Sequence, residues 1–146
     1  MAGLRLRILA VGKLKQPGLE AMVADYVKRA RSLTPIELLH VRDLDALRSR
    51  AGGSGKAPIV VLDERGSQID SPTLAAWIEG YRDDGRRQVD FMIGDAHGFS
   101  DEDRKRADRV LALSRMTLPH RLAQVMLVEQ LYRAATIIAG HPYHHA

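Results

Sequence analysis

Cysteine is absent from this 146-residue chain. Disulfides, thiolate metal sites and cysteine nucleophiles are therefore excluded, and a reducing compartment is favoured. Long hydrophobic runs are also missing near the N-terminus, where only residues 8–11 are continuously apolar before Gly12 and Lys13. Such a run is too short for a signal peptide or a membrane span, so we expect a cytoplasmic protein with no membrane partner.

The composition suits one globular domain. Hydrophobic residues make up 45% of the chain and charged residues 27%, which is enough for one core, and we expect a single domain over residues 1–146. The formal net charge of +4 and the isoelectric point near 9.7 favour an anionic partner, of which nucleic acid is the commonest. Charge alone does not separate this reading from arginines that only solvate helix faces.

Segments with strand-like and helical spacing alternate along the chain. Strand-like apolar runs cover residues 4–11, 35–41, 59–63, 88–94 and 110–113. Helical spacing covers residues 19–31, a segment from the N-cap Ser71 through Pro72 to residue 83, and residues 121–139. We also expect short helices over residues 43–50 and over residues 101–108, the second behind the N-cap Ser100. This alternation predicts an α/β fold with a mostly parallel sheet and helices on both of its faces.

Three of the predicted strands end in turns that could form a ligand site. The first ends at Leu62-Asp63, the second at Gly94, and the third in the serine- and threonine-containing run 113–118. Ligands of parallel sheets bind outside the carboxyl ends of the strands, where backbone groups lack ladder partners. The sequence therefore predicts a crevice at this edge. The glycine-rich run 51–56 is not a phosphate loop, because it leads into a strand and lacks the serine or threonine after its lysine.

The C-terminal helix is apolar on nearly all sides. Between Leu122 and Ala139, 13 of 18 residues are apolar. A helix of this kind must be buried on more than one side, so we expect a homodimer to cover it. Glu129 and Arg133 interrupt the run at i,i+4 spacing, which a structural ion pair explains at least as well as a catalytic role.

Three motifs together resemble one known family. The segments IGDAHGFS, LALSRMTLPHRLAQVMLVEQLYRA and HPYH are similar to the ribosomal RNA large subunit methyltransferase H family, of the SPOUT class, and the likeness extends to LRILAVGKLK and VVLDERG. The resemblance implies a SPOUT-like domain with a C-terminal trefoil knot that acts as a homodimer. It also implies methyl transfer from S-adenosylmethionine to N3 of a pseudouridine in large-subunit ribosomal RNA, within the assembled ribosome.

The resemblance also assigns the cofactor contacts. They fall on Leu62, Gly94, Leu113, Ser114, Arg115, Met116, Thr117 and Leu118. These positions lie at the three strand ends where the residue pattern already predicts a crevice. We therefore expect the substitution Gly94→Val to push a side chain into the space of the ligand.

The candidate catalytic residues are His144, Tyr143, Arg133 and Glu129, in the tail and helix that match the family. The imide N3 carries a proton that must leave, so a base or a group that stabilises the developing anion helps. His144 suits the base role and Arg133 the anion role. We expect no metal, because no cysteine or acidic residue lies close to the tail histidines and Pro142 breaks helical ligand spacing. The tail could instead only pack or be solvated.

Two departures from the family pattern keep other readings open. Family members usually have glycine where Asp95 stands and a cation where His145 stands. The first alternative is a non-catalytic, dimeric RNA-binding module. The second is a SPOUT methyltransferase with another RNA target. Calorimetry with S-adenosylmethionine would separate the first alternative from both enzyme readings.

Overall fold

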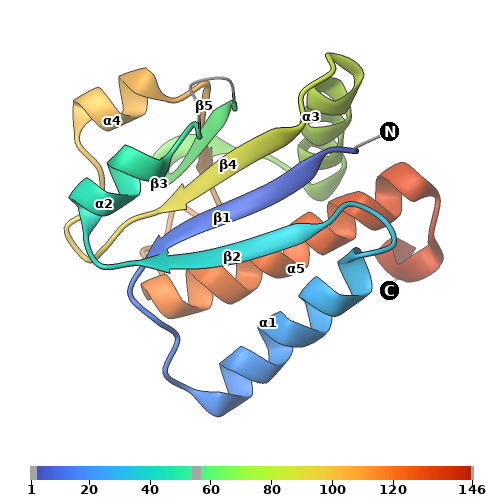
Figure 1. Cartoon of the computed structure of the whole chain (residues 1–146), viewed down its shortest axis with the longest axis horizontal. Coiled ribbons are helices and arrows are strands. Elements are labelled where there is room, and N and C mark those ends of the chain that lie inside the picture. Colours follow the sequence, from blue (N-terminus) through green and yellow to red (C-terminus); the bar gives the residue numbers. More distant parts are fainter. Residues whose placement is uncertain (1–2, 54–56, 146) are drawn as a thin grey trace.

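The computed structural model describes residues 3–53 and 57–145, and the side chains of residues 3–53 and 57–143. Within them the chain forms one parallel sheet in the order β2-β1-β4-β3-β5 (Figure 1). The strands are β1 (Arg5–Val11), β2 (Ile36–Val41), β3 (Ile59–Gln68), β4 (Gln88–Ile93) and β5 (Arg109–Ala112). The predicted α/β fold with a parallel sheet is confirmed.

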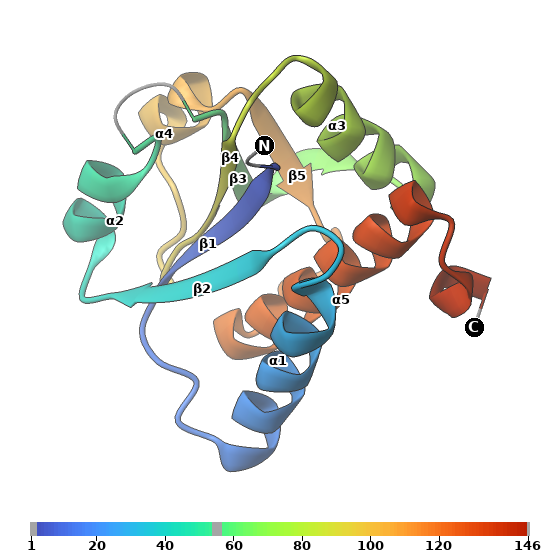
Figure 2. The same ribbon diagram turned by 45° about the vertical axis from the view of Figure 1, so that its right-hand side comes forward.

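Helices cover both faces of this sheet, as predicted. One layer holds α1 (Pro17–Ala30), α3 (Ser71–Asp83) and α5 (His120–Ala139), with the short 3-10 helix η1 (Pro142–His145) after α5. The other layer holds α2 (Leu44–Arg50) and α4 (Asp101–Arg106). Figure 2 shows α1 beside α5 on one side of the sheet, and α2 and α4 on the other.

Two apolar clusters fill the spaces between the layers. Along β1, Leu6 and Ile8 belong to the cluster under α1, α3 and α5, whereas Leu9 belongs to the cluster under α2. This division follows from the alternation of side chains along a strand. Phe91 of β4 joins the larger cluster and Met92 the smaller one. Because both faces of the strands are covered, their sequences read as nearly continuous apolar runs.

A buried ion pair between Arg7 and Asp90 joins β1 and β4 near the amino edge of the sheet. The Asp90 carboxylate is fully buried and accepts hydrogen bonds from Arg7 Nε at 3.0 Å and Nη2 at 2.8 Å. It also accepts from the backbone N–H of Gly52 at 2.8 Å. A buried carboxylate is tolerated only when it is paired in this way. The opposite, carboxyl edge carries the free loops.

Helix α3 begins differently from the prediction. Its N-cap is Asp70, whose side chain accepts from the Thr73 N–H at 2.9 Å, and not Ser71. The Ser71 hydroxyl instead donates to Gln130 Oε1 on α5 at 2.6 Å. Asp70 is the N-cap because its carboxylate accepts from the N–H of the third helical residue. The Ser71 hydroxyl is used for the hydrogen bond between α3 and α5. The N-cap predicted at Ser100 is confirmed by a full capping box.

Most of α5 is covered within the single chain. Residues along its length, including Leu127, Leu131 and Ala135, are buried against α1, α3 and the sheet. Among its described large apolar side chains, Leu122 and Met126 stay exposed, at 45% and 40%. The premise that one chain cannot cover this helix is therefore wrong for most of it. Among the described residues, no helix is both long and apolar enough to cross a membrane.

Candidate active site

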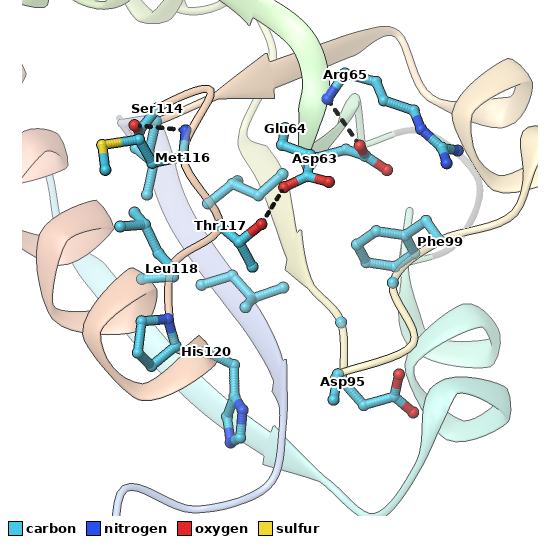
Figure 3. A pocket seen from close by; sticks show the side chains of 18 of the residues that line it. Asp63, Glu64, Arg65, Asp95, Phe99, Ser114, Met116, Thr117, Leu118 and His120 are labelled. Carbon is cyan, nitrogen blue, oxygen red and sulfur yellow. Dashed lines mark hydrogen bonds between the residues drawn. The ribbon is translucent and has the colours of Figure 1, made fainter.

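A cavity of about 560 Å³ opens at the middle of β3 and at the carboxyl ends of β4 and β5, the two strands that flank β3 in the sheet (Figure 3). This volume lies within the range of small-molecule sites. Its walls come from residues 62–65 of β3, from the segments that follow β4 and β5, and from the first turn of α5. The lining residues are Leu62, Asp63, Glu64, Arg65, Ile93, Gly94, Asp95, Ala96, His97, Gly98, Phe99, Leu111, Leu113, Ser114, Met116, Thr117, Leu118, Pro119, His120 and Ala123.

A bulge in β3 shapes one wall of the cavity. Leu62 and Ser67 both pair with Leu111 of β5, so the residues between them leave the ladder. Gly66 lies against β5 so closely that a Cβ atom there would sit 2.6 Å from the carbonyl carbon and oxygen of Val110. Only glycine fits at that distance without a shift of the backbone. The bulge carries acidic and basic side chains to the cavity.

Asp63 is the most deeply held of these bulge side chains. Its carboxylate is 10% exposed and accepts from Arg104 Nη1 of α4 at 2.9 Å. It also accepts from the Arg65 N–H at 2.9 Å. The same Arg104 nitrogen donates to the Phe99 carbonyl at 2.8 Å. These contacts join the β3 bulge, helix α4 and the loop after β4 into one rigid wall.

A hydrogen bond crosses the mouth of the cavity. Thr117 Oγ1, on the loop after β5, donates to Glu64 Oε2 on the β3 bulge at 2.9 Å (Figure 3). Earlier in the same loop, Ser114 Oγ accepts from the Met116 N–H at 3.0 Å, which forms a tight turn. The Met116 side chain is 76% exposed beside this mouth. Two polar contacts thus fix a loop that has no strand or helix of its own.

Gly94 lines the cavity and lies against side chains of the smaller apolar cluster. A Cβ atom at this position would lie 3.2 and 3.3 Å from two Phe99 ring carbons and 3.5 Å from Leu44 Cδ2. An added side chain would therefore meet the smaller apolar cluster. That Gly94→Val pushes a side chain into the space of the ligand stays a prediction. A larger residue would act on the cavity by displacing the Phe99 ring, which is part of its lining.

The structure brings seven of the eight predicted cofactor residues to this one cavity; the exception is Arg115, which is exposed and outside the lining. The sequence analysis placed Asp63 at the crevice without giving it a role, and it did not select Glu64, Phe99 or His120, which also line the cavity. The two carboxylates follow a predicted strand directly, so their position was a usable signal. Phe99 had no such signal, because a lone aromatic residue after a turn usually reads as core.

Three of the four predicted catalytic residues lie in a second group, here named the tail cluster and defined as Arg29, Glu129, Tyr132, Arg133 and Tyr143. Arg133 Nε donates to Glu129 Oε1 at 3.1 Å and Oε2 at 3.2 Å. The Tyr143 hydroxyl lies 3.5 Å from Glu129 Oε2. The Arg133 guanidinium carbon is 5.1 Å from the centre of the Tyr143 ring. The structure therefore brings three of the four predicted residues into contact.

The protonation of the tail is partly set by burial. Burial raises the pKa of Tyr143 further above its ordinary value, so its phenol is protonated at neutral pH and can donate a hydrogen bond to Glu129. The backbone of His144 lies in η1, but its side chain is outside the described residues, as is that of His145. His141 Nδ1 accepts from the Tyr143 N–H at 3.2 Å. Among the described residues, no three histidine, aspartate or glutamate side chains are grouped to hold a metal ion.

The cavity lies at the amino end of α5, and the tail cluster lies toward its carboxyl end, where η1 follows the helix. His120, at the amino end of the helix, lines the cavity, whereas Glu129 lies at the middle of the helix and Arg133 in its second half. At 1.5 Å per residue, Arg133 is roughly 20 Å further along the axis than His120. Within one chain, the described residues of the tail cluster therefore lie away from the cavity.

The whole chain is similar to known methyltransferases. The family model described as a predicted SPOUT methyltransferase matches residues 4–144. The protein named ribosomal RNA large subunit methyltransferase H from Geobacter metallireducens is 43% identical, over 98% of this chain and 100% of that protein. The protein of the same name from Geobacter sulfurreducens is 42% identical, over 97% of this chain and 100% of its own length.

Solved structures show the same fold at lower sequence identity. A probable methylase family protein from Haemophilus influenzae aligns with a TM-score of 0.57 and 14% identity, covering 96% of this chain and 70% of that one. A probable methyltransferase from Bordetella pertussis aligns with a TM-score of 0.57 and 13% identity, covering 90% of this chain and 96% of that one. At these identities the likeness concerns the fold alone.

Proposed function

Because the chain belongs to the ribosomal RNA large subunit methyltransferase H family of SPOUT methyltransferases, we propose that it transfers a methyl group from S-adenosylmethionine to N3 of a pseudouridine in large-subunit ribosomal RNA. We further propose that it acts on assembled ribosomes in the cytoplasm. One observation carries the proposal. Residues from three separate strand ends, which the family resemblance associates with the cofactor, line a single cavity of suitable size.

The lining of the cavity fits the chemistry of S-adenosylmethionine. Ile93, Phe99 and Leu118 offer apolar surface for a flat base. Asp63 and Glu64 offer carboxylate oxygens that suit hydroxyl groups and cationic groups. When bound, the cofactor supplies a methyl group on a sulfonium sulfur, which becomes a neutral thioether after transfer. The protein must then hold the acceptor nitrogen in line with the methyl group and the sulfur, and it must accept the proton that leaves N3.

We propose that a second copy of the chain completes the site. The cavity and the tail cluster are too far apart to act together within one chain. A homodimer can place the tail cluster of one copy beside the cavity of the other. The apolar side chains left exposed near the cavity, Met116, Leu122 and Met126, provide a surface for such contact. Monomers in sedimentation at micromolar concentration would contradict this arrangement.

In the proposed reaction the tail handles the proton that leaves N3. His144 accepts it, because an imidazole is the side chain whose ordinary pKa lies nearest neutrality. Arg133 presents planar donors that stabilise the developing negative charge. Glu129 holds this guanidinium in place through its two hydrogen bonds. Tyr143 keeps its proton and so contributes a donor or a packing surface beside them.

Calorimetry and radiolabelled methyl transfer test the proposal together. The protein should bind S-adenosylmethionine and label large-subunit RNA in ribosomes that lack the modification. Leu118→Arg places a charge in the cavity and should abolish both signals. Ala76→Arg makes the same addition at an exposed position of α3 and should leave both unchanged. Binding without transfer to these ribosomes would favour another RNA target, and RNA binding without cofactor binding would favour a non-catalytic module.

A further inference from the structure

Three tyrosine rings form a continuous stack around the tail. The Tyr26 and Tyr132 ring centres are 5.8 Å apart with an angle of 38° between the planes. The Tyr132 and Tyr143 centres are 4.7 Å apart with an angle of 64°, an edge-to-face arrangement. The three rings come from α1, α5 and η1. The stack therefore joins a helix from the first quarter of the chain to its C-terminal tail.

Arg29 lies over all three rings. Its guanidinium carbon is 4.9 Å from the Tyr132 centre, 5.1 Å from the Tyr143 centre and 5.9 Å from the Tyr26 centre. Each distance is within the range of a cation–π interaction. Its only other described partner is Asp25, at 3.5 Å and largely exposed. The nearby Arg31 is exposed and contacts no ring among the described residues.

Tyr143 is the main anchor of the tail. Gly140, with a φ of 72°, ends α5 in the left-handed conformation, and the chain then leaves the helix. His141 and Pro142 are exposed, whereas Tyr143 packs against the larger apolar cluster. Of the tail side chains described, only the Tyr143 ring is packed into the body of the protein. Whatever holds that ring also fixes the backbone of His144, the next residue.

We propose that Arg29 is a positioning residue for the reaction. It holds the Tyr143 ring from one side while Arg133 lies 5.1 Å from the same ring. In this way it fixes where His144 is presented, without touching the substrate itself. The inference rests on the proposed function, because the role of His144 does. A cation that only complements the end of α1 would have no such effect on the tail.

Three variants separate positioning from general helix charge. Arg29→Ala removes the cation–π contacts, Arg29→Lys keeps a cation over the rings, and Arg31→Ala removes a cation from the same helix end. We expect Arg29→Ala to lower kcat about tenfold, with the KM for S-adenosylmethionine within about twofold of the parent. Arg29→Lys should recover most of the lost turnover. Arg31→Ala should match the parent in both constants.

Amide hydrogen exchange measures the tail without reference to activity. In the full chain, Arg29→Ala should speed exchange in residues 140–145 several-fold, and Arg31→Ala should not. Parental exchange in Arg29→Ala would overturn the proposal. So would faster exchange with parental kcat, because the tail would then move without consequence for the reaction. An inactive parent protein would reject the proposed function, while faster exchange in Arg29→Ala would still identify Arg29 as the residue that holds the tail.

Discussion

The two ends of α5 are built in different ways. At the amino end, the bulge of β3 and the loops after β4 and β5 enclose a cavity, and hydrogen bonds such as Asp63–Arg104 and Thr117–Glu64 fix its walls. At the carboxyl end, stacked rings and guanidinium groups hold a short tail against the helix surface. The first arrangement is suited to enclose a ligand. The second presents proton donors and acceptors at a surface, where they can serve a substrate bound elsewhere.

The separation between the ends makes them testable as independent units. Substitutions more than about 7–10 Å apart with no shared partners usually have additive effects. The cavity and the tail cluster meet this condition within one chain. A variant at the cavity should therefore leave the tail unchanged, and the reverse. In the proposed dimer they meet across the two copies, so only catalysis should depend on both.

The largest effect is expected at Gly66, in the cavity wall. Gly66→Ala puts a Cβ atom 2.6 Å from backbone atoms of Val110, which cannot yield as a flexible side chain can. We expect a loss of about 3 kcal/mol in the free energy of unfolding. Gly80→Ala is the matched control, because no atom lies within 4 Å of its added Cβ on α3. That variant should gain up to about 1 kcal/mol from helix propensity.

Urea unfolding measures both glycine variants. Amide exchange then localises the damage: Gly66→Ala should lose protection in β3 and β5, with residues 140–145 unaffected under native conditions. Equal stability of the two alanine variants would mean that the β3 bulge can shift freely. The cavity wall would then be less rigid than its contacts indicate.

The next effect is expected at the tail. His144→Ala should lower methyl transfer roughly 10²-fold, the scale of a lost acid–base group. Binding of S-adenosylmethionine and dimerisation should stay as in the parent, because in the proposed reaction His144 acts on the RNA acceptor and not on the cofactor. Radiolabelled transfer and calorimetry measure the two properties separately. Turnover near that of the parent would show that the tail only packs or positions.

The order of elements was predictable because the strands begin as apolar runs, the long helices have 3.6-residue spacing, and the short helix after Ser100 has a recognisable N-cap. The strand order was not, since it depends on pairings such as Leu6 with Val89 that leave no periodic trace. The extension of β3 to Gln68 was also missed. Its polar sequence lacks a strand pattern, and only the backbone of β5 makes it a strand. The trefoil knot implied by the family stays a prediction.

The candidate site was predictable in part. The residue pattern placed a crevice at three strand ends, and the family resemblance supplied individual residues there. The direction of a side chain at Gly94 could not be predicted, because it depends on Phe99 packing beneath it. The distance between the tail cluster and the cavity could have been predicted. A helix of 20 residues that begins at the crevice must end roughly 30 Å away.

Low pH should lower the free energy of unfolding by removing the Arg48–Asp103 ion pair, and this effect should be smaller than that of Gly66→Ala. The Arg48 guanidinium, which donates to both carboxylate oxygens of Asp103 at 2.8 and 2.9 Å, holds the pKa of Asp103 well below its usual range. A depressed pKa means that the folded protein binds fewer protons than the unfolded chain below about pH 4. The stability from this pair is therefore present above about pH 4 and is lost as the pH falls further.

Asp103→Asn tests this dependence. The variant should be less stable at pH 7 and should lose less free energy of unfolding between pH 5 and pH 2, as measured by urea unfolding across that range. Exchange should rise first in the loop after β4, because Asp103 also accepts from the N–H and hydroxyl of Ser100. Parallel pH profiles for parent and variant would show that other carboxylates control the acid response.

The smallest effect is expected at the hydrogen bond that crosses the cavity mouth. Thr117→Val keeps the shape of the side chain but removes the hydroxyl that donates to Glu64 at 2.9 Å. Both residues are exposed, so the free energy of S-adenosylmethionine binding should become less favourable by about 0.5–1 kcal/mol. This corresponds to an affinity up to about fivefold weaker. Glu64→Gln keeps an acceptor oxygen for the hydroxyl and should bind closer to the parent than Thr117→Val, as calorimetry would measure. If Glu64→Gln weakens binding more, the negative charge of Glu64 matters to the ligand beyond its bond to Thr117, and the mouth of the cavity is then part of the binding surface.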